Sequence, residues 1–417
     1  MVYLNGLVGY HGKHGCRLYC GVTGRHKPGG SHYYPAMLKP HNYLIEGCDH
    51  GDIDPAHIAA CLPELYFSNL RHVMLSSNVT QYKKQRLETG IVKPSIFMGL
   101  KSGSILDIPG CFGSDIMHLV ALNLPDLLLG LWRGTIDCDK TDNRDSWDWA
   151  VLKGDVWKTH GAAVAPMTPY LPGSFDRPPR NPAEKINSGF KAWEFLIYVF
   201  GLGPGLFYKI LPEKYWKNYC KLVFGICIVH QQEILTVDLT QAHTALIEFV
   251  TEFEELYYQR RVDRLHFVRP AIHSTLHLAS EVPRVGPGLC GSQWTIERTI
   301  GNLGEEIRQP SNPYANLSQR GLRCCQINAL KAMHPELEPN NGGLPRGARD
   351  IGNGYALLRA KEDTARPVRQ CEVAAFHAYL GEKRVKVCQI IGAHVSADGH
   401  VFDYPMDKLL ALVGKRI

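Results

Sequence analysis

The chain has 417 residues, of which 45% are hydrophobic and 21% are charged. This composition is sufficient for a substantial core, and the length allows two or three domains. The net charge of +6 excludes a histone-like basic protein, and it is compatible with nucleic-acid binding without requiring it.

Cysteine usage indicates a reducing compartment, the cytosol or the nucleus. The thirteen cysteines are an odd number and are scattered from Cys16 to Cys388, whereas a disulfide framework is dense and occupies a small secreted domain. We expect no secretory signal, because no charged segment followed by an apolar one opens the sequence. The most apolar stretch, residues 195–211, is interrupted by Pro204 and three glycines, so we expect a buried helix–turn–helix and no membrane partner.

Helical periodicity is weak until Ser114. Residues 1–45 are rich in glycine, histidine, tyrosine and lysine, which favours strands and loops. A helix is predicted over Pro55–Leu70 within the mixed region that follows. From Ser114 the pattern is helical, and we predict a helix that Ser114 caps, that runs to Leu128 and that is kinked at Pro125.

Helices dominate the middle of the chain. The six prolines between residues 166 and 182 predict an extended connector. After this connector, the spacing of apolar residues predicts helices over residues 184–200, 213–231, 238–261, 263–280, 292–308 and 316–333. The asparagines and glycines at 340–343 predict a break, and we expect a small mixed α/β or β-rich tail over 344–417.

Two cysteines near the start of the chain have a spacing that suits metal ligands. Three residues separate Cys16 from Cys20, and several histidines flank the pair. Two thiolates this close in sequence can supply half of a tetrahedral zinc site. The alternative is a pair of free or buried cysteines with no ligand.

Two histidines offer the complementary half of such a site. His273 and His277 are four positions apart, so they share one face of the predicted helix, as two ligands of one metal must. The alternative is a pair of histidines on a helix surface. Together with the cysteines they form a Cys2His2 set that would join distant parts of the chain, unlike a zinc finger, whose ligands lie within about thirty residues.

Acidic residues in two predicted helices are candidates for catalysis. Asp115 lies in the first turn of a helix, where its charge suits the helix dipole, and His118 follows it on the same face. Glu297 lies between Trp294 and Arg298 on a short predicted helix. The alternatives are an aspartate that serves only the helix end and a glutamate that is simply solvated.

In their order along the chain, these motifs resemble the CACTA (En/Spm) superfamily of DNA transposases, in the form carried by mushroom-type fungi. The run FGSDIMHLVALNLP at 112–125 resembles the family's D-x2-H motif, and WTIERTIG at 294–301 matches the segment with its last catalytic carboxylate. The cysteine pair and the H-x3-H pair resemble the family's paired ligands. The runs at 132–145 and 309–321 also resemble this fungal group, so the resemblance covers roughly residues 1–360.

The resemblance implies a mainly α fold with α/β parts, in which a partial RNase H-like core is interrupted by a large helical insertion. We accordingly expect four regions. They are a partial RNase H-like, zinc-associated segment at 1–110, the helical insertion at 111–291, the helix of the last catalytic carboxylate at 292–340, and a small C-terminal tail domain at 341–417.

The resemblance also implies a role for each candidate residue. The residues expected to bind a structural zinc ion are Cys16, Cys20, His273 and His277. Glu297 would be the surviving ligand of the catalytic Mg²⁺ or Mn²⁺ of an intact enzyme. Asp115 and His118 would belong to the catalytic set by supporting the wall of the active site.

The sequence departs from the family before Cys16. Two catalytic aspartates precede the cysteine pair in the family, which has two residues and not three between its cysteines, whereas none of the residues before Cys16 is acidic here. Two-metal phosphoryl transfer needs carboxylates that hold two ions about 4 Å apart, which Glu297 alone cannot do. Asp107 and Asp115 are poor replacements, so we expect this form of the chain to be catalytically inactive.

The expected function is that of a transposase-like protein of DNA transposition in the nucleus. Its partner would be DNA at transposon ends, and a homo-oligomer is a further expectation. The basic residues expected to contact DNA are Arg298, Arg308, Arg320 and Arg323. The alternatives are a non-catalytic DNA-binding or transposase-interacting protein and a zinc-stabilised scaffold.

Overall fold

The computed structural model describes residues 2–99, 106, 108–171, 178–288, 291–307 and 311–337, together with the backbone of 349–352, 355–357 and 394–396. The chain divides into two compact units. Unit 1 comprises Met1–Pro166 and Pro179–Thr299, and unit 2 comprises Met167–Pro178 and Ile300–Ile417. All the residues predicted to bind metal or to act in catalysis belong to unit 1.

The N-terminal segment of unit 1 is mostly loop, with one short pair of strands. Helix α1 (Val2–Asn5) precedes strand β1 (Arg25–His26), which pairs antiparallel with β2 (Tyr33–Tyr34). The buried guanidinium of Arg25 holds the loops by donating to three backbone carbonyls of residues 48–51 at 2.8–2.9 Å. The predicted strand-and-loop character of this segment is confirmed.

A helical hairpin follows the loops. The 3-10 turn η1 (Pro55–His57) leads to α2 (Pro63–Met74), which packs against α3 (Val79–Thr89). The continuous helix predicted over Pro55–Leu70 is therefore wrong in its first part. Pro63 lies in the first turn of α2, where the N–H that proline lacks would have no partner within the helix, so the helix begins there.

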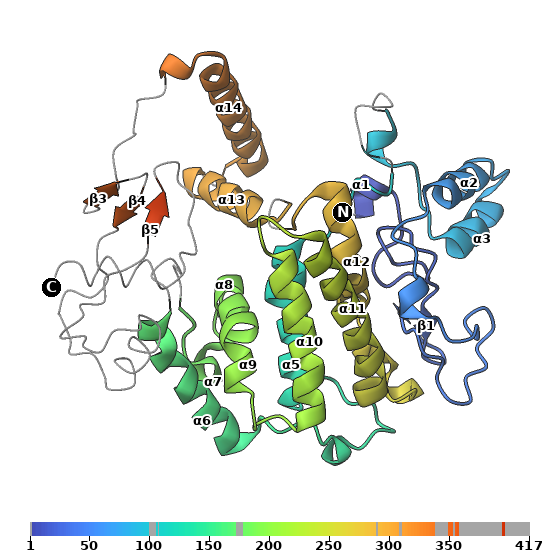
Figure 1. Cartoon of the computed structure of the whole chain (residues 1–417). Coiled ribbons are helices and arrows are strands. Elements are labelled where there is room, and N and C mark those ends of the chain that lie inside the picture. The colour runs from blue at the N-terminus through green and yellow to red at the C-terminus, as the bar shows by residue number, and fades with distance from the viewer. Residues whose placement is uncertain are drawn as a thin grey trace. The chain divides into compact units, whose positions relative to one another are not determined.

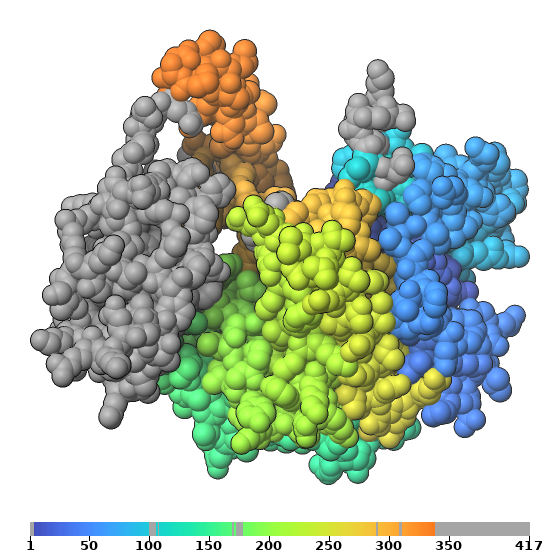
Figure 2. All heavy atoms as spheres, viewed as in Figure 1, coloured from blue at the N-terminus to red at the C-terminus, as the bar shows by residue number. Residues whose placement is uncertain are grey.

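The core of unit 1 is a helical bundle. Helix α5 (Leu124–Trp132) lies beside α10 (Glu213–Val229), and α11 (Thr236–Phe253) packs against both α10 and α12 (Pro270–Val285) (Figure 1). A Cβ atom at Gly225 would lie only 2.6 Å from the side chain of Leu246, so glycine is what lets α10 and α11 approach closely. In the space-filling view α10 covers the middle of the bundle (Figure 2).

Shorter helices complete unit 1, and three of the helical turns are π-helical. Beyond the bundle, the short helices are α4 (Ile116–His118), α6 (Gly154–Val164), α7 (Pro182–Lys185), α8 (Ala192–Phe195), α9 (Gly203–Leu206) and the 3-10 turn η8 (Val262–Phe267). The π-helical turns are η3 (Leu119–Asn123), η6 (Leu196–Leu202) and η7 (Glu254–Tyr258). Helices are present where 213–231 and 238–261 were predicted, the second ending in the π-helical turn η7. The continuous helices predicted over 184–200 and 263–280 are wrong: the first is divided among α7, α8 and η6, and the second begins as η8 before α12 starts at Pro270.

Unit 2 contains helix α14 (Pro313–Met333) and the end of α13 (Trp294–Glu306), whose beginning belongs to unit 1. Its antiparallel sheet has the order β3 (Arg349–Gly352), β4 (Tyr355–Leu357) and β5 (His394–Ser396). The tail predicted over 344–417 lies outside the described residues apart from these strands.

The described part of the chain is mainly helical, as the sequence predicted. Among these residues, no helix combines the length and the apolar character that crossing a lipid bilayer requires. The connector predicted over 166–182 is only partly described. The prediction of an extended segment is wrong over its first residues, because Ala165–Tyr170 form a 3-10 turn, η5. Residues 172–177 lie outside the described residues.

Candidate metal centre and the adjacent acidic site

Helix α12 presents two histidines on its buried face. The helix has Pro270 in its first turn, where a missing N–H breaks no hydrogen bond. His273 and His277 are each 3% exposed and lie one turn apart on the same face. Their Nε2 atoms are 3.1 Å apart, so both rings present the same nitrogen to one point.

The two cysteines come from a tight turn of the N-terminal loop. The N–H of Tyr19 donates to the carbonyl of Cys16 at 3.1 Å, and Tyr19 has a φ of 54°, so the chain reverses direction before Cys20. The Tyr19 hydroxyl donates to the carbonyl of Thr89 and accepts from the amide of Asn69, both at 2.7 Å. These bonds anchor the cysteine turn to the hairpin of α2 and α3.

The four side chains converge on one point. Cys16 Sγ lies 3.5 Å from His277 Nε2, and Cys20 Sγ lies 3.4 Å from His273 Nε2. All four ligand atoms lie within 4.8 Å of one another. A zinc ion with bonds of about 2.3 Å to sulfur and 2.0–2.1 Å to nitrogen defines a tetrahedron with edges of about 3.3–3.8 Å. The spacing in this Cys2His2 cluster therefore suits one zinc ion.

The pKa values of the two thiols in the cluster are shifted in opposite directions. The hydrogen bond with Cys20 lowers the pKa of the Cys16 thiol well below its usual value, and the nearby His277 adds to this effect. The same contact, together with burial, raises the pKa of the Cys20 thiol. Zinc binding would stabilise both side chains as thiolates, because the thiolate is the form of cysteine that binds the metal.

The donor set of the cluster fits zinc and does not fit Mg²⁺ or Mn²⁺. Thiolates and imidazoles are ligands for zinc, whereas the harder cations prefer oxygen. Two thiolates neutralise a dication, so the loaded cluster has no net charge and can be buried at low cost. Within the described part of the chain, Nδ1 of His273 is buried without a hydrogen-bond partner, so the polar contacts of this ring are those of its Nε2 atom in the cluster.

A second candidate site begins at Asp115. Its carboxylate caps α4 by accepting from the N–H of Met117 at 3.1 Å, accepts from the N–H of Gln293 at 3.3 Å, and contacts Nδ1 of His118. The prediction that Ser114 caps this helix is wrong, and Asp115 takes that place. Asp115 therefore caps the start of α4 and also orients His118. From the sequence alone, a role at the helix end and a role in the site were alternatives.

Glu281 connects α12 to this second site. Its carboxylate accepts from the N–H of Ser114 at 2.5 Å and from the Ser114 hydroxyl at 2.8 Å, which occupies the side chain that was expected to cap α4. Glu281 is 5% exposed and follows His277 by one turn on the same buried face. Sequence reasoning missed this residue, although its spacing of four from His277 was a usable signal.

Glu297 approaches His118 from helix α13. Its Oε1 atom lies 4.0 Å from Nε2 of His118, and its side chain is 48% exposed. The start of α13 is held by the ring of Trp294, which packs against Trp193 with centroids 5.4 Å apart. The structure thus brings together Glu297 and the Asp115–His118 pair, which lie far apart in the sequence.

The contact between Asp115 and His118 determines what this acidic site can do. A carboxylate on Nδ1 favours the tautomer that leaves Nε2 free of a proton, so that Nε2 can bind a cation or accept a proton. The carboxylate of Glu297 lies on the other side of His118, with its Oε1 atom 4.0 Å from Nε2.

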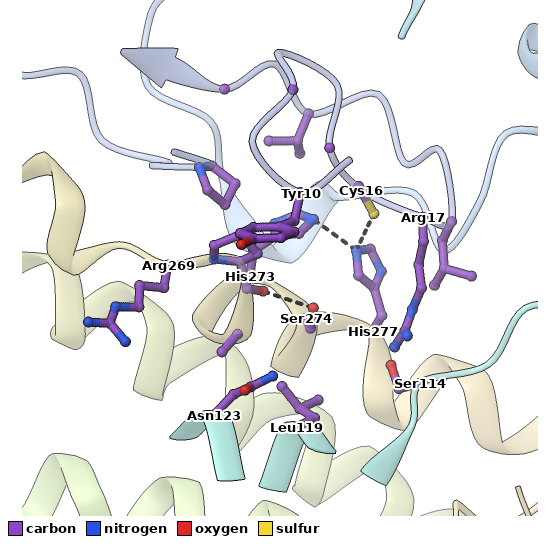
Figure 3. A pocket seen from close by; sticks show the side chains of 18 of the residues that line it. Tyr10, Cys16, Arg17, Ser114, Leu119, Asn123, Arg269, His273, Ser274 and His277 are labelled. Atoms are coloured by element: carbon purple, nitrogen blue, oxygen red, sulfur yellow. Dashed lines mark hydrogen bonds between the residues drawn. The ribbon is translucent and has the colours of Figure 1, made fainter. Parts of the chain in front are cut away.

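A pocket of about 730 Å³ lies between the two sites. Cys16, His273 and His277 form part of its wall, and Asp115 and His118 form another part. Figure 3 shows Cys16 and the paired histidines, with Ser114, Leu119 and Asn123 of the pocket wall below them. The zinc-type cluster and the acidic site therefore face one common space.

Comparison of the chain with family models, with curated proteins and with solved structures gave no match. The geometry of the side chains therefore carries the functional interpretation.

Proposed function

We propose that this chain is a transposase-like protein of the CACTA type that binds DNA at transposon ends in the nucleus. The observation that supports this most strongly is the convergence of Cys16 and Cys20 with His273 and His277, separated by as many as 261 residues. The family has the same two pairs in the same order. A zinc ion there would join the N-terminal segment to the helix before the last catalytic carboxylate.

The position of Glu297 gives further support. In the proposal, Glu297 is the ligand of Mg²⁺ or Mn²⁺, and its neighbour His118, 4.0 Å away, belongs to the same wall of the active site. Asp115 orients His118 and also accepts from the backbone at the start of the segment that carries Glu297. For the fold, the proposal is a partial RNase H-like core that is interrupted by a large helical insertion.

The proposed DNA contacts are electrostatic. Arg298 on α13 and Arg320 and Arg323 on α14 are exposed, and Arg308 lies outside the described residues. Such side chains bind phosphate and release counterions, so binding weakens steeply as salt is added. We also propose a homo-oligomer, because a transposon has two ends and one copy of the chain would bind each of them.

The test combines DNA binding with a cleavage assay. Binding to duplex DNA should weaken by orders of magnitude between about 50 and 200 mM salt. With Mg²⁺ or Mn²⁺, supercoiled plasmid and linear duplex should remain uncut, because one glutamate cannot position two ions. Binding that does not depend on salt would contradict the proposal and favour a zinc-stabilised scaffold. Cleavage that disappears in Glu297→Gln would show that another acidic residue completes the site.

A non-catalytic DNA-binding protein is the second candidate, and the use of Asp115 favours it. This aspartate, a member of the expected catalytic set, already accepts from two backbone N–H groups and contacts His118. Its oxygens are therefore poorly placed to bind a second cation, and Asp107 lies outside the described residues. Salt-sensitive binding without cleavage under any metal would support this candidate.

A further inference from the structure

The pocket between the Cys2His2 cluster and the acidic site contains an arginine with no partner. Arg17 directly follows a cluster ligand, is partly buried and lines the pocket. Within the described part of the chain it makes no ion pair or hydrogen bond. Figure 3 shows its side chain alongside His277, with the guanidinium toward Ser114. Because no acceptor in the described part of the chain pairs with this guanidinium, its donors are free to bind an anionic ligand.

The carboxylates of the pocket are already committed to other partners. Glu281 accepts two hydrogen bonds from Ser114. Asp115 contacts His118, and Asp126 pairs with Arg269 at 2.8 Å. With its thiolates neutralised by zinc, the cluster itself would add no negative charge. Lys13 and Arg17 also line the pocket, and in the described part of the chain neither makes an ion pair, so both cations are free to bind a phosphate group.

The mouth of the pocket also has an exposed aromatic ring. Tyr10 is 61% exposed, and its ring centroid lies 3.9 Å from that of His11, which in turn lies 3.7 Å from that of His32. The neighbouring rings brace Tyr10 in place while leaving most of it accessible. An exposed aromatic ring and an unpaired arginine that line one pocket can together bind a single-stranded nucleic acid, with the base stacked on the ring and the phosphate paired with the arginine.

The dimensions of the pocket restrict the ligand further. A volume of about 730 Å³ holds a group of the size of a nucleotide, whereas a duplex cannot enter, since its major groove alone is about 12 Å wide. Arg17 lies on one side of the paired histidines and Arg269 lies on the other (Figure 3). The ion pair of Arg269 with Asp126 is exposed, so a second phosphate can displace the carboxylate at little cost.

We propose that this pocket binds unpaired nucleotides of a single nucleic-acid strand, with a phosphate on Arg17 and a base stacked on Tyr10. The proposal rests on the proposed function in taking nucleic acid as the substrate, and it adds a site for unpaired nucleotides. It places the strand between the Cys2His2 cluster and His118, next to the acidic site.

The test measures binding of a labelled oligothymidylate to the zinc-loaded full chain by fluorescence anisotropy over a range of salt. Tyr10→Leu should weaken binding roughly 5- to 100-fold, the effect of losing one stacked base, and Tyr10→Phe should retain most of the affinity. Arg17→Gln should weaken binding about tenfold and lower the salt slope by about 0.7, the value for one phosphate on a single strand. Arg17→Lys should recover part of that loss.

The matched control is Arg71→Gln, which removes an exposed arginine of α2 outside the pocket lining. Equal effects of Arg17→Gln and Arg71→Gln would overturn the proposal, as would unchanged affinity in Tyr10→Leu. Zinc content and thermal unfolding verify that each variant is folded. Thymidine monophosphate and inorganic phosphate serve as competitors, and displacement of the strand by either at equal concentration would show a small-anion pocket and overturn the proposal.

Duplex DNA separates this proposal from the proposed function. If duplex binding is steeply salt-dependent while the pocket variants leave strand binding unchanged, the pocket proposal fails and the proposed function stands. If the strand binds in the pocket while duplex DNA does not bind, the pocket proposal stands and the proposed function fails.

Discussion

Helix α12 contributes to two clusters of very different character. At the Cys2His2 cluster, the histidines are almost fully buried and every ligand atom has another ligand within 4.8 Å. At the acidic site, the side chain of His118 is 42% exposed, that of Glu297 is 48% exposed, and their closest atoms are 4.0 Å apart. The first cluster is closed and pre-organised, as a structural metal site is, and the second is open, as a site for a ligand is.

The difference between the two clusters predicts which of them contributes more to the free energy of unfolding. A closed cluster that joins distant segments should dominate the stability of unit 1, because metal binding there is coupled to folding. An open group should contribute little to stability and much to ligand binding. The following substitutions test this ordering, from the largest expected effect to the smallest.

Removing a ligand of the Cys2His2 cluster should have the largest effect. Cys20→Ser or His273→Ala should abolish stoichiometric zinc binding and lower the free energy of unfolding by on the order of 5 kcal/mol. A chelator should lower the thermal stability of the wild type toward that of the variants. The control is Cys227→Ser, an exposed cysteine outside the cluster, which should leave zinc content and stability unchanged. Wild-type stability in Cys20→Ser would contradict the account.

His160 is a buried histidine that lies outside the Cys2His2 cluster. It is 2% exposed, bonds the hydroxyl of Tyr198 at 2.7 Å and stacks on Phe207, and burial lowers its pKa to about 4. Because the folded pKa lies below the ordinary value of about 6.5, the unfolded chain binds the proton first as the pH falls. Stability from this residue is complete above pH 6.5 and should decrease by about 3 kcal/mol as the pH falls to 4.

The comparison with His160→Phe isolates this effect. The variant should be less stable at neutral pH, because the Tyr198 hydroxyl loses its partner, but its stability should fall less steeply in acid. Urea unfolding of both proteins over this pH range measures the difference, and release of zinc in acid affects both equally. Parallel pH profiles would show that His160 does not titrate in this way.

Glu281 connects the closed cluster to the open site, and its replacement should have an intermediate effect. Glu281→Gln weakens the two hydrogen bonds to Ser114 and places an amide donor against a backbone N–H, so we expect a loss of about 2 kcal/mol. Glu248→Gln is the matched control, because Glu248 is half-exposed and pairs with Lys221. Urea unfolding of zinc-loaded protein measures both. Equal losses of stability in Glu281→Gln and Glu248→Gln would contradict the claim that Glu281 connects the cluster to the acidic site.

Glu297→Gln should have the smallest effect on stability, within about 0.5 kcal/mol of the wild type. Glu297 is half-exposed, and its Oε1 atom lies 4.0 Å from Nε2 of His118. The same urea experiment applies. A loss above about 2 kcal/mol would show that Glu297 is a structural residue, since surface pairs contribute less than about 1 kcal/mol.

The sequence predicted the closed cluster better than the open site, for a physical reason. Two histidines four positions apart must share a helix face, and closely spaced thiols suit one metal, so each half of the cluster follows from local spacing. The pairing of the halves depended on the resemblance to a family, because no local pattern links residues 253 positions apart.

Sequence reasoning was weaker where a side chain acts on a distant part of the chain. Ser114 has the side chain of a helix cap, but Glu281 occupies it and Asp115 caps the helix instead. The first part of the helix predicted from Pro55 is a 3-10 turn because Pro63 begins a new helix. The π-helical turns were missed because one inserted residue hardly changes apolar periodicity.

X-ray absorption at the zinc edge tests the central claim most directly, namely that Cys16, Cys20, His273 and His277 hold one zinc ion. The account predicts one zinc per chain, with two sulfur ligands at about 2.3 Å and two nitrogen ligands at about 2.0–2.1 Å. In Cys20→Ser the two-sulfur signal should be lost. A chain that retains no zinc after purification, or a spectrum with only oxygen and nitrogen ligands, would contradict the account.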